Sequence, residues 1–400
     1  MSHLPLQGIR ILDLTQALAG PFATMILADL GAEVIKIEPP TGDLTRTTPP
    51  HRVQGTSLYF VTNNRNKRGV VLNLKQPAAL QAFYGLCAHA DVVIYNFSEG
   101  VAERLRIDPE TLRALHPRLI VCNMTGYGRQ GPDARRKAVD PIIQSLAGAV
   151  SITGIPGGEP VRAGIPTADL STGLFAAIGV LAALQGRAST GEGASVEASL
   201  FHSQLNLLNY IGTYCLRSGQ VPGPVGSGHP GTVPSQVFET QDGWVTIDAG
   251  FDRHFRTLCD LLGRADLAAD PRFVDRAARA AHRHELLPTL IDMIRQQTTA
   301  HWIAALDQAG IPCGKVNNVQ EALESPQSRE YHAVRETTYE GEPVQVLTTP
   351  LWFDGRIDHP MTPPPTLGQD TEAVLRGLLG YGDEAIARVQ AEARAESAVA

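Results

Sequence analysis

Cysteine, charge and long apolar runs are all scarce in this chain of 400 residues. It has five cysteines, and no two of them form a CxxC pair: Cys87, Cys122, Cys215, Cys259 and Cys313. Scattered cysteines of this kind argue against a disulfide framework and against a zinc site. The longest uncharged apolar run, residues 173–184, is too short to span a bilayer, and residues 1–10 lack the apolar core of a signal peptide. We therefore expect a soluble, reduced, cytoplasmic protein with no metal and no membrane partner.

The balance of charge is mildly acidic. Lys and Arg together number 34 and Asp and Glu together number 41, which gives a net charge of −7. This balance argues against nucleic acid as the main partner, while a local basic pocket for a small anion is compatible with it. Hydrophobic residues make up 43% of the chain, a share typical of globular proteins. At roughly 150 residues per domain, the length suggests two to three domains.

Apolar strand patterns alternate with helical patterns in the first third of the chain. The expected helices cover residues 21–30 and 76–89, and the expected strands cover residues 9–14, 33–37, 69–74, 91–96 and 119–124. Strands separated by helices predict a parallel sheet that helices cover on both faces. Ligands of such sheets bind at the carboxyl ends of the strands. The polar segments after the strands are therefore the candidate binding loops: 15–20, 38–46, 96–104 and 125–140.

The rest of the chain predicts a second, smaller domain. Residues 172–184 and 195–210 have helical patterns, and the Gly- and Pro-rich segment after them indicates a linker. A hairpin is expected over residues 236–249 and helices over 252–309. We expect four parts along the chain: a large domain over residues 1–215, a linker over 216–235, a small domain over 236–330 and a return segment over 331–400 that completes the large domain.

Residues 126–131, Gly-Tyr-Gly-Arg-Gln-Gly, match the GxGxxG pattern of dinucleotide-binding loops and follow a predicted strand. Pro132 and the basic residues after it do not form the expected helix face, and the acidic residue expected about 20 positions further is missing. We therefore expect a tight loop here. A dinucleotide-dependent dehydrogenase is an alternative for which the chain offers no other cofactor site, and the P-loop, zincin and serine-hydrolase signatures are absent.

Asp169 directly precedes an apolar helical pattern. An Asp in this place is typical of a helix N-cap, because its carboxylate accepts a hydrogen bond from a backbone amide. It is also a place where a carboxylate can act on a carbonyl group, with the free amides of the helix start holding the developing oxyanion. The residues alone leave both interpretations open.

A series of short motifs stands in a fixed order along the chain, beginning with Ile-Leu-Asp-Leu-Thr-Gln-Ala-Leu-Ala-Gly-Pro-Phe at residues 11–22. The others are residues 30–43, 63–69, 96–97 with Arg104, 125–132, 191–197, 310–314 and 367–371. Together they resemble the class III CoA-transferases, the relatives of formyl-CoA transferase and carnitine CoA-transferase. The resemblance covers essentially the whole chain and is carried by the order and spacing of the motifs.

The resemblance implies an α/β fold with a large Rossmann-like domain on a parallel sheet, a smaller α+β domain, and an interlocked homodimer whose subunits thread through each other. It implies that Asp169 is the catalytic nucleophile and attacks the thioester carbonyl of a donor acyl-CoA. The reaction then passes through a mixed anhydride and an aspartyl-CoA thioester. Acyl-CoA and a small carboxylic acid are thus the expected partners, and CoA is a substrate rather than a permanently bound cofactor.

The resemblance also assigns residues to CoA, position by position. Those that match CoA contacts of the family are Gln16, Ala17, Leu72, Asn73, Lys75, Asn96, Phe97, Arg104 and Lys137. The cations among them suit the phosphates of CoA. The chain departs from some members at Pro39, where they have an arginine, and Arg46 is the candidate to replace that phosphate contact.

Racemases of the same fold resemble this chain at Asp169 as well. They use a His directly before the Asp that matches Asp140, and this chain has Val139 there, which cannot transfer a proton. The substitution favours CoA transfer. A racemase-like enzyme and a non-catalytic acyl-CoA-binding homologue remain the alternatives.

The acids that exchange CoA are suggested by one loop. Residues 226–231 lack the run of glycines found in formyl-CoA:oxalate enzymes, and the element around His229 is closer to enzymes that use succinyl-CoA with dicarboxylates. We expect His229 to meet the second carboxylate of such an acid. Asp140 is expected either to line the acyl site or to cap the helix that begins at Pro141.

Overall fold

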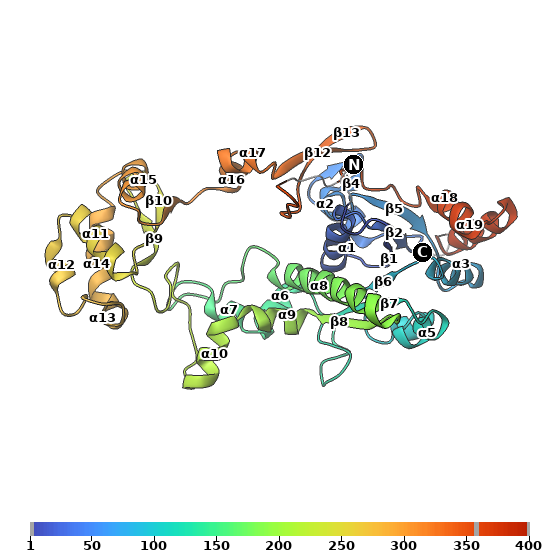
Figure 1. Cartoon of the computed structure of the whole chain (residues 1–400), viewed down its shortest axis with the longest axis horizontal. Coiled ribbons are helices and arrows are strands. Elements are labelled where there is room, and N and C mark those ends of the chain that lie inside the picture. The colour runs from blue at the N-terminus through green and yellow to red at the C-terminus, as the bar shows by residue number, and fades with distance from the viewer. Residues whose placement is uncertain (1–3, 356–359, 398–400) are drawn as a thin grey trace. The chain divides into compact units, whose positions relative to one another are not determined.

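The computed structural model describes residues 4–355 and 360–397, and the chain forms two compact units (Figure 1). Residues 4–149, 163–217, 329–355 and 360–397 form the larger unit, and residues 150–162 and 218–328 form the smaller one. The chain therefore leaves the larger unit twice and returns to it twice.

A six-stranded parallel sheet is the centre of the larger unit. Its strand order is β5-β2-β1-β6-β7-β8, and each adjacent pair runs parallel. The strands are β1 Arg10–Asp13, β2 Glu33–Glu38, β5 Lys67–Val71, β6 Val92–Tyr95, β7 Ile120–Thr125 and β8 Ser195–Ser199. The predicted parallel α/β sheet is confirmed, and its central strands are rich in Val and Ile because both of their faces are buried.

The sixth strand, β8, corrects one expectation. The pattern of residues 195–210 predicts a single helix, but the first five of these residues pair in parallel with β7. Helix α9 Leu200–Leu207 begins only after them, and the Ser199 hydroxyl caps it by accepting the His202 N–H. Polar residues occupy every other position of Ser195–Ser199, a pattern that suits an edge strand with one face on the core.

Helices cover both faces of the sheet (Figure 1). Ile11 and its neighbours on one face pack in one hydrophobic cluster with two helices, α1 Ala19–Asp29 and α8 Thr167–Thr190. Leu12 and its neighbours on the other face pack with α3 Pro77–Cys87 and α18 Thr371–Leu379. Ile11 and Leu12 are consecutive, so they point to opposite faces and supply both layers of the core.

Helix α8 is the one helix in the described residues that is long and apolar enough to cross a membrane, a test that the core helix of a globular protein also passes. Ala176 and Val180 lie in the core cluster that α8 shares with α1 and the sheet. Leu174, Phe175 and Ile178 are exposed on the same helix. The helix therefore has one side in the core and an apolar side on the surface.

The last part of the larger unit closes the free edge of the sheet at β5. The Gly69 N–H donates to Asp370 Oδ2 at 2.8 Å, and the Val71 N–H donates to Thr371 Oγ1 at 3.0 Å. The Asp370 N–H donates in turn to the Gly69 carbonyl at 2.8 Å. Residues 360–371 thus satisfy backbone groups that an edge strand otherwise leaves open.

The smaller unit is built on a three-stranded antiparallel sheet of order β11-β10-β9. The strands β9 Ser235–Glu239 and β10 Trp244–Asp248 form the predicted hairpin, and β11 is Cys313–Lys315. Arg279 is fully buried there and donates to the carbonyl groups of Val233 and Gly250 at 2.8 and 2.7 Å. One hydrophobic cluster joins the sheet to the helices of this unit.

The remaining helices and strands are mostly short. They are η1 Leu44–Thr47, β3 Arg52–Val53, β4 Thr56–Ser57, α2 Leu58–Asn63, α4 Val101–Leu105, α5 Pro109–Leu115, α6 Asp140–Leu146, α7 Ala149–Ile152, α10 Asn209–Ser218, α11 Asp252–Leu261, α12 Ala265–Ala269, α13 Arg276–Ala281, α14 Arg283–Ile294, α15 Thr299–Gln308, α16 Val319–Leu323, α17 Pro326–Glu330, β12 Val334–Tyr339, β13 Glu342–Leu347 and α19 Asp383–Ser397.

Candidate active site

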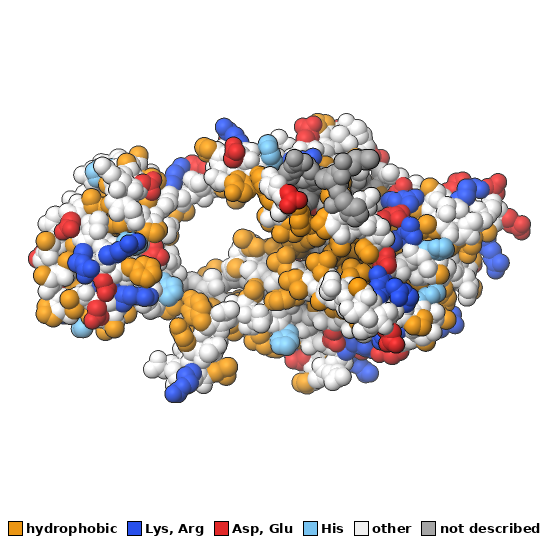
Figure 2. All heavy atoms as spheres, viewed as in Figure 1, with side chains coloured by type: hydrophobic (Ala, Val, Ile, Leu, Met, Phe, Trp, Pro, Cys, Tyr) orange, Lys and Arg blue, Asp and Glu red, His pale blue; other side chains and the backbone are white. Residues whose placement is uncertain are grey.

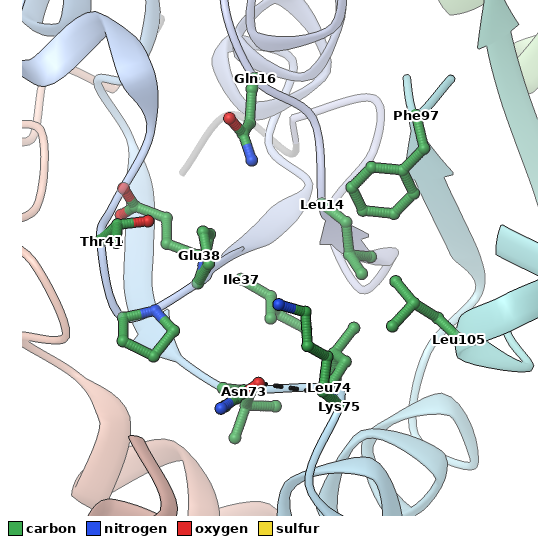
Figure 3. A pocket seen from close by; sticks show the side chains of 13 residues that line it. Leu14, Gln16, Ile37, Glu38, Thr41, Asn73, Leu74, Lys75, Phe97 and Leu105 are labelled. Carbon is green, nitrogen blue, oxygen red and sulfur yellow. Dashed lines mark hydrogen bonds between the residues drawn. The ribbon is translucent and has the colours of Figure 1, made fainter. Parts of the chain in front are cut away.

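A cavity of about 270 Å³ lies at the carboxyl ends of β1, β2, β5 and β6 (Figure 3). We call it the first cavity. Its lining comes from the last two residues of β2 and from the segments that follow the four strands: Leu14, Gln16, Ile37, Glu38, Pro39, Pro40, Thr41, Leu72, Asn73, Leu74, Lys75, Phe97 and Leu105. This is the edge at which ligands of parallel sheets bind.

Five of the residues matched to CoA contacts line the first cavity: Gln16, Leu72, Asn73, Lys75 and Phe97. The Phe97 ring stacks on Tyr95 with its centroid 5.5 Å away, which fixes an aromatic wall. Asn73 Nδ2 is buried and has no hydrogen-bond partner among the described residues. The largely apolar lining and the aromatic wall suit a flat heteroaromatic group.

A second cavity of about 430 Å³ shares Leu74, Lys75 and Leu105 with the first. It is also lined by Arg104 and Arg106. Both of these side chains are exposed. Together with Lys75 they provide positive charge on one side of the first cavity, which suits phosphate groups.

The other residues matched to CoA have different surroundings. Asn96 holds the backbone of Gln16: its Oδ1 accepts the Gln16 N–H at 2.9 Å and its Nδ2 donates to the Gln16 carbonyl at 2.7 Å. Ala17 has a left-handed backbone with φ +67°. Lys137 is exposed in the segment between β7 and α6 and lines neither cavity.

Arg46 does not take the role expected for it. Its buried guanidinium donates to both carboxylate oxygens of Glu38, at 2.8 and 2.7 Å, and stacks over the Phe60 ring at 3.7 Å. Because Glu38 neutralises this cation and burial shields it, Arg46 is not available to a ligand phosphate. The phosphate contact that Pro39 removes is therefore not restored by Arg46.

A close helix contact joins the first cavity to the helix of Asp169. A Cβ on Gly173 of α8 would lie 2.7 Å from the Ala19 carbonyl oxygen, so only glycine permits the observed approach of α1. Asp169 and Gly173 are four residues apart and share a face of α8. The loop that carries Gln16 therefore lies against the face of α8 that carries Asp169.

Asp169 is the third residue of α8, and its side chain makes no capping hydrogen bond there. The N-cap interpretation of Asp169 is therefore wrong. Asp140 takes the capping role instead: its Oδ2 accepts the N–H groups of Ala168 and Asp169 at 2.9 and 3.3 Å. Because both amides are bound to Asp140, they are not free to hold an oxyanion as the sequence led us to expect.

Asp140 caps a different helix from the one expected. It is the first residue of α6, yet its carboxylate binds the start of α8. Its Oδ1 accepts a hydrogen bond from Gln144 Nε2 at 2.6 Å, and Gln144 Oε1 accepts the Ala163 N–H at 3.1 Å. Both carboxylate oxygens of Asp140 are thus engaged in holding the segment that leads into Asp169.

The Asp169 carboxyl is half-buried and has an acidic neighbour. Two causes raise the pKa of Asp169 to about 6: burial is the larger one and the charge of Asp140 is the smaller one. Around pH 7 the group is ionised but poorly solvated, which makes it a stronger nucleophile than an exposed carboxylate.

Tyr59 of α2 belongs to the same environment, and sequence reasoning missed it. Burial raises the pKa of its hydroxyl to about 12, and the charges of Asp169, Asp43 and Asp140 add to the rise. The hydroxyl therefore stays protonated and able to donate at neutral pH. Nothing in the sequence around Tyr59 marks it, because its neighbours at the site come from distant segments.

Two further expectations concern loops. No helix follows residues 126–131 until α6 begins at Asp140, so the predicted tight loop is confirmed. His229 lies in the smaller unit, where its Nδ1 accepts the Gly231 N–H at 3.0 Å. Its role toward an acid stays a prediction.

Among residues 4–355 and 360–397, no group of three or more His, Cys, Asp or Glu side chains is placed to hold a metal ion.

The model of CoA-transferase family III matches residues 6–371. The chain belongs to this family. Human succinyl-CoA:glutarate CoA-transferase is 35% identical, with the match covering 96% of this chain and 88% of that protein. Acetyl-CoA:oxalate CoA-transferase of Acetobacter aceti is 40% identical, over 81% of this chain and 84% of that one. The crystal structure of a CAIB/BAIF family protein from Brucella suis superposes with a TM-score of 0.83 at 35% identity, covering 94% of this chain and 100% of that one.

These comparisons confirm the resemblance drawn from the sequence motifs. A family III enzyme is a CoA-transferase, so its substrates are CoA thioesters and carboxylic acids.

Proposed function

We propose that this CoA-transferase moves CoA from succinyl-CoA to a dicarboxylic acid, with Asp169 as the nucleophile. The observation that carries the proposal is the Asp169 carboxyl: half-buried, raised in pKa, and presented beside the loop of the first cavity. The relative named for succinyl-CoA and glutarate, which matches almost the whole chain, supports the choice of acids.

CoA binding is proposed along the two cavities. The adenine ring is placed in the first cavity, against Phe97 and beside Asn73. The phosphates are placed at the positive side of the second cavity, at Lys75 and Arg104. The thioester arm then passes Gln16 and the Ala17 backbone toward α8. Lys137 remains a proposed contact at the surface.

The proposed reaction needs no proton transfer. An Asp169 oxygen attacks the thioester carbonyl carbon, the C–S bond breaks, and the CoA thiolate leaves with the electron pair. The thiolate attacks the Asp169 acyl carbon and expels succinate, which gives an aspartyl-CoA thioester. The acceptor carboxylate then attacks the acyl carbon of this thioester, releases the thiolate and forms a second anhydride with Asp169. The thiolate attacks the acceptor carbonyl carbon of that anhydride, which gives the acceptor CoA thioester and restores the Asp169 carboxylate.

Water must be excluded during these steps, because the anhydrides and the thioester all hydrolyse. Asp140 is proposed to act through Asp169 by fixing the first turn of α8, since both of its oxygens are occupied. His229 is proposed to meet the second carboxylate of the acceptor. Val139, which stands where the racemases have a histidine, supports transfer over racemisation.

A homodimer is proposed from the exposed apolar side of the larger unit. Hydrophobic side chains gather over α6 and α8 in Figure 2, and the exposed ones include Ile142, Leu146, Leu174, Phe175 and Ile178. Exposed apolar clusters of this kind mark protein interfaces. We assign a second copy of the chain as the partner, interlocked as in the family. Native mass spectrometry tests this: the mass of two chains is expected, and Ile178→Glu is expected to yield single chains.

A reducing, cytoplasmic location is also proposed. All five cysteines are free, and Cys87, Cys122 and Cys259 are buried. Fractionation of cells that express the protein, followed by blotting, tests the location.

The function is tested by mixing the protein with succinyl-CoA and a pool of mono- and dicarboxylic acids and measuring new acyl-CoA masses. The wild type is expected to form a dicarboxylyl-CoA, and Asp169→Asn, which keeps the shape of the side chain, is expected to form none. A CoA adduct on the peptide that carries Asp169 is expected when acceptor is withheld. Equal product from both proteins would contradict the assignment of Asp169, and an acceptor with one carboxylate would contradict the choice of acid.

A further inference from the structure

The loop between β1 and α1 is held by charged side chains on either side of Gln16. Lys36 Nζ donates to the Thr15 carbonyl oxygen at 2.8 Å. Asp43 Oδ1 accepts the Ala17 N–H at 3.3 Å. The backbone just before and just after Gln16 is therefore bound to two ionised groups, in addition to the hydrogen bonds that Asn96 makes with Gln16 itself.

Lys36 and Asp43 also bind each other. Lys36 Nζ lies 2.9 Å from Asp43 Oδ2, and both side chains are fully buried. Lys36 comes from β2, and Asp43 is the N-cap of η1, where it accepts the Thr45 N–H at 2.9 Å. The pair thus links the end of a central strand, the turn after it and the loop of Gln16.

Stability alone does not explain the buried Lys36–Asp43 pair or the backbone conformation of Ala17. A buried ion pair is weak support for stability, because desolvation of the two charges offsets their attraction. Ala17 adopts φ +67°, a region that glycine occupies far more readily than alanine. Strained backbone of this kind persists only where the surroundings fix it, and such places gather at functional sites.

A second buried ion pair supports the same loop. Lys67 Nζ lies 2.9 Å from Asp13 Oδ2, and both side chains are fully buried. Asp13 Oδ1 accepts the Thr15 N–H at 2.9 Å. Two buried ion pairs therefore hydrogen-bond to the backbone of residues 15–17. The Gln16 side chain between them lines the first cavity (Figure 3).

A third buried pair, Arg65 with Asp29, provides the comparison. It is as deeply buried as the other two. Its hydrogen bonds reach Asn66 and Thr349, which tie the return segment to the larger unit. It is thus a structural pair of the same kind in the same unit, and the hydrogen bonds named here run to residues other than 15–17.

We propose that Lys36 and Asp43 are positioning residues of the transfer reaction. They hold Ala17 in its left-handed conformation and so fix Gln16 and the loop against the first turns of α8, where the acyl group is carried on Asp169. The held loop keeps water from the anhydride and from the aspartyl-CoA thioester. This inference rests on the proposed function of Asp169.

The test compares two double variants in which an apolar side chain of similar size replaces each carboxylate, so that no acceptor is left: Lys36→Met/Asp43→Leu and, as the matched control, Arg65→Met/Asp29→Leu. Each neutralises a whole buried pair, which disturbs folding less than removal of one partner. The readout is the ratio of succinyl-CoA hydrolysed to CoA transferred, which does not depend on the fraction of active protein. The first variant is expected to lose roughly ten- to a hundredfold in kcat and to gain about tenfold in this ratio, because the loop is misplaced. The control is expected to keep the wild-type ratio.

Rescue adds a second readout. Ala17→Gly, added to Lys36→Met/Asp43→Leu, is expected to restore part of the transfer rate, because glycine adopts φ +67° without help. A purely structural role of the pair predicts no rescue from residue 17. If the double variant does not fold, Asp43→Glu is compared with Asp29→Glu on the same ratio, because each of these keeps its buried pair charged and only displaces the carboxylate.

Four results would overturn the inference. A wild-type ratio in the Lys36→Met/Asp43→Leu variant, or an equal rise in the control, would overturn it and leave the proposed function intact. No rescue by Ala17→Gly would overturn the role assigned to the left-handed conformation. Absence of CoA transfer by the wild type would overturn the proposed function and this inference together.

Discussion

The Asp140 carboxylate accepts the backbone N–H of Asp169 at 3.3 Å, so an acidic side chain caps the helix turn that carries the proposed nucleophile. The same group has two opposing effects. Its hydrogen bonds fix the first turn of α8, and its negative charge raises the pKa of the neighbouring carboxyl. The site thus combines a rigid backbone with a carboxylate that is costly to ionise.

The first prediction concerns the pH dependence of transfer. Asp169 must be ionised to attack, and its pKa is about 6, against an ordinary value of 3.8. The rate of transfer is therefore expected to fall as the pH drops through about 6. Single-turnover rates of CoA release between pH 4.5 and 8 check this. A rate that stays constant down to pH 4.5 would show that Asp169 titrates in its ordinary range.

Asp140→Asn tests whether the charge of Asp140 raises the pKa of Asp169. Removal of the charge lowers the pKa of Asp169, so the acid limb of the rate profile is expected to move to lower pH. The introduced amide side chain keeps an oxygen that accepts a backbone N–H, so the fold is expected to persist. The profile of Asp140→Asn is measured beside that of Glu197→Gln, which alters an acid hydrogen-bonded to Arg129 instead. A shift to higher pH in Asp140→Asn would contradict the assignment.

Asp169→Asn is expected to stabilise the protein while it abolishes transfer. The folded state binds a proton at Asp169 more tightly than the unfolded state, so ionisation of this carboxyl lowers stability as the pH rises from about 4 to above 6. The variant removes that penalty, a gain of about 1–3 kcal/mol at pH 7.5. The gain is expected to vanish near pH 4. Urea unfolding at the two pH values measures it, and an equal gain at both would point to a cause other than ionisation.

Gly173→Ala tests the contact that brings Asp169 beside the loop of Gln16. The added methyl group would lie 2.7 Å from the Ala19 carbonyl oxygen, so α1 and α8 must move apart. A loss of about 1–3 kcal/mol in unfolding free energy is expected, together with a lower kcat. Gly186→Ala is the control on the same helix, because nothing lies within 4 Å of its added methyl group. It is expected to gain roughly 0.5–1 kcal/mol and to keep kcat.

Arg104→Ala tests the phosphate side of the second cavity. Loss of one charge-assisted contact is expected to raise the KM for succinyl-CoA roughly tenfold. The kcat is expected to stay close to that of the wild type, because the phosphates bind equally in the ground and transition states. Arg376→Ala, which removes an exposed arginine paired with Glu372 and Asp383, is the control. A fall in kcat at constant KM would place Arg104 near the reacting atoms instead.

The sequence predicts what depends on local patterns. The alternation of apolar runs and helices is enough for the parallel sheet, and the rule that ligands bind at carboxyl ends of strands is enough for the part of the cavity at Gln16 and Phe97. Asn73 falls inside an expected strand, and only the resemblance assigns it to the site. The position of Asp169 before an apolar helix marks it as a capping or functional residue, and only the resemblance favours the second role.

What the sequence does not predict depends on pairing between distant segments. Asp140 begins its own helix, and nothing local indicates that it caps another helix that begins 27 residues later at Thr167. Arg46 has the charge expected of a phosphate ligand, but Glu38 neutralises it in the fold. Residues 195–199 form a strand only because β7 offers an edge, since their own pattern is too short to outweigh the helical pattern that follows.

The closure of β5 by residues 360–371 has a consequence for biosynthesis. All six strands of the sheet leave the ribosome before these residues do, so the backbone of Gly69 and Val71 stays unpaired during most of translation. An open strand edge is a template for pairing with another nascent chain. The larger unit is therefore completed only once its last segment has been made, and until then the edge at β5 is open to such pairing.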